Sequence, residues 1–277
     1  SDNILSKISS QLRAEYQRDK DSRKEWEDGY TSGLDLLGFK YTQPSKPFRG
    51  ASGVTHPLLS EAITQFQAQA YKELLPSSGP VKTAIVGVQN EKTEDQASRV
   101  KNFMNYQITE KMEEYTPEMD QLLFYLPLAG SAFKKIYYDE IMDRPVAKFV
   151  PAEDIIVPYY SSNLQDCERI THCLRMSEND LYKKMDSGFY RDVDIKPSTN
   201  SQTSIQKKYD ELEGKSPTQQ AYNYQILEMH VDLNLEKFEN PEDKEKKIKV
   251  PYIVTIDEGS GKILSIYRNY EEGDRLF

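Results

Sequence analysis

The side chains best suited to chemistry are few in this sequence, and they lie far apart along the chain. The three histidines are His56, His172 and His230, and no two of them have the H-x-x-x-H spacing of a metal site. The two cysteines, Cys167 and Cys173, would lie about 20 Å apart in an extended strand, too far to form a disulfide with each other. We therefore expect no metal site, no disulfide and no catalytic residue, and we interpret the histidines as structural.

Motifs that hold a nucleotide or activate a serine are also absent. Neither G-x-x-x-x-G-K-[ST] nor G-x-G-x-x-G occurs, so we expect no cofactor and no packaging motor. Gly50-Ala51-Ser52-Gly53 lacks the spacing of a G-x-S-x-G elbow, and no strand-like run precedes it, which makes Ser52 a predicted turn residue. The acidic pairs Glu153-Asp154 and Glu271-Glu272 are predicted to be solvated surface residues.

One glycine-rich loop offers a binding feature. It lies beside Arg49 and runs into a predicted helix start, where free backbone N–H groups could hold a phosphate or a neighbour's carboxylate. The alternative is that its glycines only close the loop. Trp26, in the second predicted helix, and Phe48, in this loop, are predicted to be partly exposed to solvent, as subunit contacts require. The candidate interface or anion-contact residues are Trp26, Phe48, Arg49, Gly50, Ser52 and His56.

Composition narrows the class of protein. The net charge of −9 argues against a protein that wraps nucleic acid, because neutralising phosphates takes a surplus of Lys and Arg on one face. No apolar run approaches the roughly 18–20 residues of a membrane span, so we expect a soluble, intracellular protein without a membrane partner. The 19 tyrosines suit either protein interfaces or half-buried strand positions, and both interpretations stay open.

Apolar periodicity predicts helices over the first 130 residues. Apolar side chains recur every three or four positions from Ile4 to Leu12 and from Trp26 to Leu37. A further helix is predicted after Pro57, with Thr55 or His56 as its cap. Later helices are expected near 97–112 and from a cap at Thr116 to Leu126.

After Gly130 the period changes to that of strands. A hairpin is predicted over 132–150, and alternating runs near 170–176, 227–235 and 248–267 predict an antiparallel meander. The fold class is therefore α+β, with a helical part over 1–130 and a β-rich part over 131–277. Residues 191–220 are polar and are predicted to form a surface excursion that holds one short helix near Ile205.

Several segments resemble the portal proteins of short-tailed phages, in the lambdoid Salmonella-phage branch and its marine relatives. The similar segments cover most of the chain, and 196–220 contributes nothing to the likeness. They are Trp26-Glu27-Asp28-Gly29-Tyr30 with Gly33 to Gly38, Pro47 to Leu58, Phe66 to Ala70, Tyr125 to Lys135, Phe149 to Asp154 and Pro251 to Asp257.

That resemblance implies a ring of about twelve subunits at one capsid vertex. Such a ring seeds assembly among the major capsid and scaffolding proteins, docks the terminase, passes double-stranded DNA in packaging and ejection without sequence specificity, and binds tail adaptors. It needs neither a catalytic residue nor a cofactor. We therefore expect a virion protein assembled in the host bacterial cytoplasm. The two parts of the chain would belong to the wing-like body, and the later stem, clip and crown regions of the family are expected to be missing.

Two other functions are weighed against this one. Another head-completion or adaptor protein of the virion would share the acidic mixed fold and the lack of catalysis, and would differ in symmetry and neighbours. A metal-dependent nuclease is a distant alternative, since it needs clustered carboxylates that no motif signals here.

Overall fold

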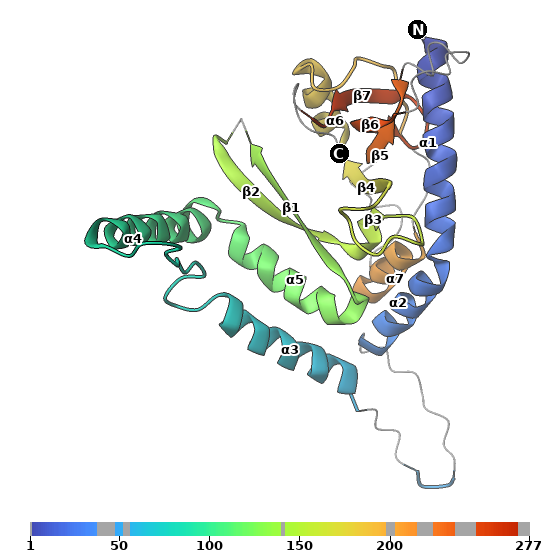
Figure 1. The fold of residues 1–277 in the computed structure, drawn as a ribbon. Coiled ribbons are helices and arrows are strands. Elements are labelled where there is room, and N and C mark those ends of the chain that lie inside the picture. The colour runs from blue at the N-terminus through green and yellow to red at the C-terminus, as the bar shows by residue number, and fades with distance from the viewer. Residues whose placement is uncertain are drawn as a thin grey trace. The chain divides into compact units, whose positions relative to one another are not determined.

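The computed structural model describes residues 2–37, 48–51, 56–139, 142–197, 203–214, 224–235 and 248–270. Packing divides the chain into two compact units. The first, called the sheet unit, consists of Ser1–Ser32 and Glu153–Phe277. The second, called the hairpin unit, is Gly33–Ala152. Helices dominate the first half and antiparallel strands the second, so the α+β prediction is confirmed (Figure 1). The change of secondary structure falls near residue 130 as predicted, whereas the sheet unit is made of two separate stretches of sequence.

The sheet unit is built on one five-stranded antiparallel sheet. Its strands follow the order β3-β4-β5-β6-β7, which is the predicted meander. The strand bounds are Ile155–Ile156 for β3, Arg169–Met176 for β4, Tyr224–Leu233 for β5, Val250–Asp257 for β6 and Ile263–Arg268 for β7. Asp257 closes the β6–β7 turn, because its Oδ2 accepts hydrogen bonds from the backbone N–H and the hydroxyl of Ser260.

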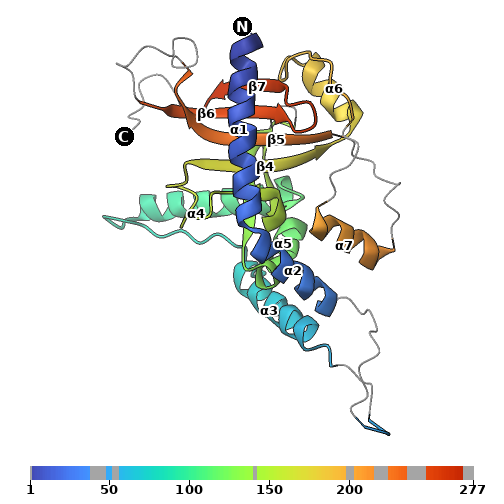
Figure 2. The same ribbon diagram turned by 90° about the vertical axis from the view of Figure 1, so that its right-hand side faces the viewer.

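A long helix covers one face of this sheet. The helix is α1 (Asp2–Ser22), and it crosses the strands in Figure 2. Its predicted stripe is buried, with Ile8, Leu12 and Tyr16 packed against alternate residues of β5 such as Leu227 and Met229. A turn at Arg23 separates α1 from α2 (Lys24–Leu37). The contact between α1 and the sheet therefore follows from two spacings of apolar residues, every fourth residue in the helix and every second residue in the strand.

The opposite face of the sheet has its own core. It is formed with α6 (Glu178–Asp186), whose Leu181 and Met185 pack with Ile226 and Leu264. Ser177 caps α6 as predicted, accepting a hydrogen bond from the N–H of Asp180 at 3.2 Å. The short helix predicted in the polar excursion is α7 (Ser204–Glu213), and its Ile205 is fully buried. Ile195, also in that excursion, is part of this second core.

The hairpin unit combines three helices with a two-stranded sheet. The elements are α3 (Leu58–Leu74), α4 (Glu91–Tyr106), the π-helical turn η1 (Gln107–Lys111), α5 (Tyr115–Ala129), β1 (Ala132–Asp139), β2 (Arg144–Pro151) and the 3-10 turn η2 (Ala152–Asp154), which continues into the sheet unit. Strands β1 and β2 pair in the predicted hairpin. Figure 1 shows α5 lying along both this hairpin and α3.

Two predicted helix caps in the hairpin unit are wrong. The N-cap of α3 is Pro57, which has no side chain able to accept a hydrogen bond, so His56 does not cap this helix. Thr55 lies outside the described residues. Helix α5 begins at Tyr115 after the N-cap Glu114, so Thr116 lies inside the helix. At the other end Gly130 adopts a left-handed φ of 79° and donates to the carbonyl of Leu126, which ends α5 where the sequence predicted the change.

Candidate functional site

The predicted contact residues are divided between the two compact units. Trp26 belongs to the sheet unit, whereas Phe48, Arg49, Gly50 and His56 belong to the hairpin unit. Ser52 lies outside the described residues. The ring of Trp26 is half-buried, because it stacks on Tyr30 at a centroid distance of 5.4 Å and carries the Arg23 guanidinium over its face. Trp26 is therefore not the exposed aromatic side chain that the sequence predicted. Phe48 is exposed, at 68%.

The described part of the glycine-rich loop is a tight turn. The N–H of Ala51 donates to the carbonyl of Phe48 at 3.1 Å, and Gly50 occupies the third position with φ of 95°. That φ is typical of glycine in a type II turn. Arg49 and His56 are exposed. The turn explains Gly50 by backbone geometry alone, so the predicted role of closing the loop has direct support.

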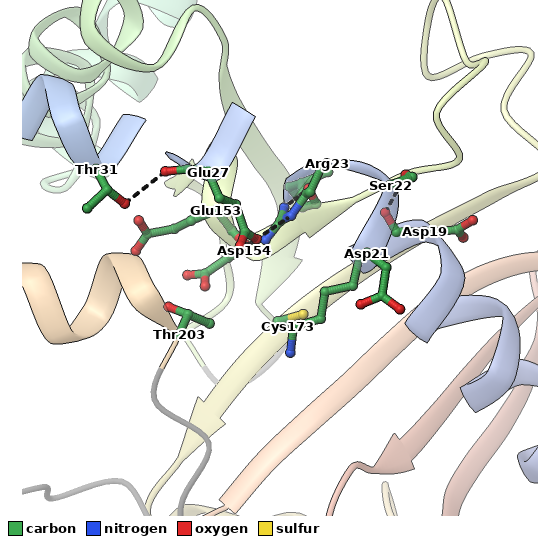
Figure 3. Close-up of polar contacts among 12 residues, drawn as sticks. Asp19, Asp21, Ser22, Arg23, Glu27, Thr31, Glu153, Asp154, Cys173 and Thr203 are labelled. Atoms are coloured by element: carbon green, nitrogen blue, oxygen red, sulfur yellow. Dashed lines mark hydrogen bonds and ion pairs between the residues drawn. The ribbon is translucent and has the colours of Figure 1, made fainter. Parts of the chain in front are cut away.

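A cluster of charged residues in the sheet unit was not predicted. Arg23 donates to Glu27 Oε1 at 2.9 Å and to the backbone carbonyls of Glu153 at 2.7 Å and Ile155 at 3.0 Å (Figure 3). Asp154 accepts a hydrogen bond from Arg175 at 2.8 Å. The helical turn after α1 is thereby attached to the start of β3, across about 130 residues of sequence.

Glu153 is buried and Asp154 is half-buried, which corrects the expectation that they form a solvated pair, whereas Glu271 and Glu272 lie outside the described residues. Only 9% of Glu153 is exposed, and its Oε2 has no hydrogen-bond partner among the described residues. Burial, helped by the charge of Asp154, raises the pKa of Glu153 to about 7. Burial likewise raises the pKa of Asp154, against the opposing charges of Arg175 and Arg23. Nothing in the sequence indicated this burial, because Arg23, which binds the backbone here, lies about 130 residues earlier in the chain.

The nearby thiol is not activated. Cys173 lies on β4 under α1, and burial raises the pKa of its thiol to about 11. Its Sγ contacts the Tyr16 hydroxyl at 3.7 Å, and burial also raises the pKa of Tyr16. A protonated thiol beside a protonated phenol favours packing over nucleophilic attack. Cys167 and Cys173 are both free in this structure.

A second charged network fixes α1 to β4. Arg169 donates to Asp19 through Nε at 2.9 Å and Nη2 at 3.1 Å, and to Glu15 through Nη1 at 2.9 Å. Arg169 and Asp19 are each more than 90% buried. A cleft of about 640 Å³ lies beside this network, with Lys7, Arg18 and Lys249 on its walls as well as Glu15 and Asp232. Charges of both signs alternate around it, so it does not present a basic groove to a polyanion.

The hairpin unit exposes much of its apolar surface. No residue of α4 is buried, and Val100, Phe103 and Met104 share one exposed face with 50%, 61% and 44% of each residue exposed. The segment before α4 exposes Val86 and Val88 almost completely. Strand β1 exposes Ile136, Tyr137 and Tyr138. Contiguous exposed apolar side chains of this kind mark interaction surfaces.

Two carboxylates of α5 protect one edge of the hairpin. Glu114 Oε1 accepts the backbone N–H of Ala147 at 3.1 Å, and Glu118 Oε2 accepts that of Phe149 at 2.7 Å. Arg144 pairs with Glu114 at 2.7 Å, and these hydrogen bonds lower the pKa of Glu114 although burial opposes them. The i,i+4 spacing of the two acids was visible in the sequence, but only the tertiary fold shows that they face a strand edge.

Within the described ranges, no group of three or more His, Cys, Asp or Glu side chains is placed to hold a metal ion. His172 and His230 lie on neighbouring strands near Glu228, whose Oε1 is 3.3 Å from His230 Nε2. Among the helices that the structure describes, none has the length and apolarity to cross a membrane.

Comparisons with protein families and with curated proteins found no match to this sequence. The function is therefore argued from the residues and surfaces themselves.

Proposed function

We propose that this chain is a structural subunit of a phage portal, a closed ring at one capsid vertex through which double-stranded DNA is packaged and ejected. The observation that carries the proposal is the exposed apolar surface of the hairpin unit, on α4 and on β1. A ring needs two different patches on each subunit that are complementary to each other, because each copy binds one neighbour on either side. The hairpin unit offers two such patches on separate elements.

The charge supports the same proposal. A channel for DNA should pass phosphates without gripping them, and a net charge of −9 on each copy favours sliding over binding. The arginines Arg23 and Arg169 are turned inward onto carboxylates and carbonyls, so they are not presented to phosphates. The proposed partners are further copies of the chain, the terminase, the major capsid and scaffolding proteins and tail adaptors. The proposed location is the virion, after assembly in the host cytoplasm.

Native mass spectrometry with negative-stain class averages tests this function. The chain is measured over a range of concentrations, alone and with capsid extracts. A closed ring of about twelve copies with an open centre is the expected result. A persistent monomer or dimer in both preparations would overturn the proposal and favour a head-completion adaptor.

A further inference from the structure

The outer edge of strand β1 carries backbone groups that the hairpin does not use. In antiparallel pairing, opposite residues alternate between hydrogen-bonded and non-hydrogen-bonded pairs. Ala147 of β2 gives its N–H to Glu114 and Phe149 gives its N–H to Glu118, so neither gives it to β1. Their partners in β1 are Ile136 and Lys134. The N–H and C=O groups of Lys134, Ile136 and Tyr138 therefore point away from β2.

A proline in β2 agrees with this alternation. Tyr138 pairs with Pro145, a residue without an N–H. Pro145 alternates with Ala147 and Phe149 along β2, so it lies at a position whose backbone groups point away from β1. The two edges of the hairpin thus differ. The β2 edge is covered by the carboxylates of Glu114 and Glu118, whereas among the described residues no third strand joins β1.

The exposed edge is apolar as well as unpaired. Ile136 is 70% exposed and Tyr138 is 57% exposed. Lysine side chains commonly protect such edges, but Lys134 turns inward, with its Nζ 3.7 Å from the centre of the Tyr115 ring. Strand edges with these properties accept an extended segment from another chain.

A second strand-like segment in the same unit also lacks a strand partner. Residues 81–86 belong to no helix or strand of the single chain, and their odd-numbered side chains are half-buried while the even-numbered ones are exposed, which is the alternation of an extended segment. Asn105 of α4 accepts the N–H of Val81 at 2.9 Å and donates to its C=O at 3.2 Å, and Thr83 donates to Ala97 O at 3.2 Å. In an extended segment the backbone groups of Lys82, Ala84 and Val86 point to the other side. The β-branched residues Val81, Thr83, Ile85 and Val86 favour pairing in a sheet.

We propose that the outer edge of β1 takes up residues 81–86 of a neighbouring copy as a third strand of the hairpin sheet. This inference rests on the proposed ring. The two segments do not pair within one copy in the described structure, and each offers three outward-facing residues, at every second position. A contact between two different segments is heterologous, which is the type that closes a ring. Pairing would also cover Ile136 and Val86, which are exposed in the single chain.

The first test removes one outward donor. Ile136→Pro deletes the N–H that points away from β2, so the hairpin keeps its internal ladder. Ile136→Val is the matched control, because it keeps both the N–H and a β-branched apolar side chain. We expect Ile136→Pro to reduce association of copies about tenfold at fixed concentration, with Ile136→Val unchanged. Circular dichroism and protease resistance verify that both variants fold.

The second test joins the two segments directly. Cysteines are placed at Ile136 in one preparation and at Lys82, Ala84 or Val86 in another, with Cys167→Ser in both. Mixing under oxidising conditions should give a two-chain product only when both preparations are present. Lys92→Cys, on the exposed side of α4, replaces the 81–86 variants as the negative control.

The outcomes separate this inference from the proposed function. A ring that forms equally well with Ile136→Pro, and gives no cross-link at any of the three positions, overturns the strand pairing and leaves the ring standing. A cross-linked product without any closed ring supports the strand pairing and contradicts the ring. If Ile136→Pro does not fold, the cross-linking experiment decides the proposal, because its variants place no proline in β1.

Discussion

The two units use their apolar residues in opposite ways. In the sheet unit, both faces of one sheet are covered, by α1 on one side and by α6 on the other, and residues such as Leu12, Met229 and Ile226 are fully buried. In the hairpin unit, α4 buries no residue, and large apolar side chains remain on its surface. The sheet unit therefore buries its apolar core with its own helices and strands. The exposed apolar side chains of the hairpin unit are those that we propose are covered by neighbouring copies.

The strongest test of the sheet unit is the removal of its buried cation. Arg169→Ala leaves Asp19 and Glu15 without their partner under α1, so it should lower the free energy of unfolding by about 3–5 kcal/mol. Urea unfolding followed by circular dichroism measures this change. Arg99→Ala in α4 is the matched control, because the Arg99–Asp95 pair is about two-thirds exposed and should contribute about 0.5 kcal/mol or less. Equal losses of unfolding free energy from the two substitutions would contradict the difference between a buried ion pair in the sheet unit and an exposed one in the hairpin unit.

The buried carboxyl of Glu153 should make the sheet unit sensitive to pH. Because its pKa is about 7 in the folded chain, above the ordinary glutamate value, the unfolded chain releases this proton first as the pH rises. The Glu153 contribution to stability is therefore lost between about pH 4.5 and pH 7.

Glu153→Gln should abolish that loss and stabilise the chain by the order of 1–3 kcal/mol at pH 8, with little effect at pH 4. Thermal unfolding across this pH range checks the prediction. Glu25→Gln, an exposed acid of α2, is the control and should leave the profile unchanged. A wild-type profile that is flat from pH 4.5 to 7 would contradict a raised pKa of Glu153 in the folded chain.

A smaller effect is expected where the hairpin unit does have internal contacts. Asn105→Ala removes both hydrogen bonds to the backbone of Val81 and should cost about 1–2 kcal/mol. Gly79 lies against the same amide, since a Cβ at Gly79 would be 2.5 Å from Asn105 Oδ1. Hydrogen exchange should speed up over 79–86 in Asn105→Ala. Asn102→Ala, at an exposed position of α4, should leave the exchange rates of these amides unchanged.

The smallest effect on stability should accompany the largest effect on association. Phe103→Ser replaces an exposed ring on α4, so it should change the free energy of unfolding by about 0.5 kcal/mol or less. The same substitution should weaken association of copies, as measured by sedimentation at several concentrations. Asn102→Ser tests the same helix outside the apolar face. If Phe103→Ser unfolds the chain instead, the exposed face of α4 belongs to a core.

Local signals in the sequence predicted most of the fold and little of the charged chemistry. The cap at Ser177, the end of α5 at Gly130 and the alternation of β5 all arise within a few residues, so their patterns identified them. The cap of α5 was misplaced because Glu114 reaches a strand more than 30 residues away. Glu153 and Asp154 were predicted to be exposed because Arg23, which binds the backbone beside them, lies in a turn about 130 residues earlier. Contacts of that range depend on packing, which one sequence does not display.

The most direct measurement is oxidative labelling of exposed side chains in dilute chains and in the assembled fraction. Met104 and Phe103 of the hairpin unit should lose labelling several-fold on assembly. Tyr159 of the sheet unit, which is 84% exposed, and Met229, which is fully buried, serve as internal references. Assembly with unchanged labelling of Met104 and Phe103 would contradict the claim that the α4 face of the hairpin unit joins neighbouring subunits.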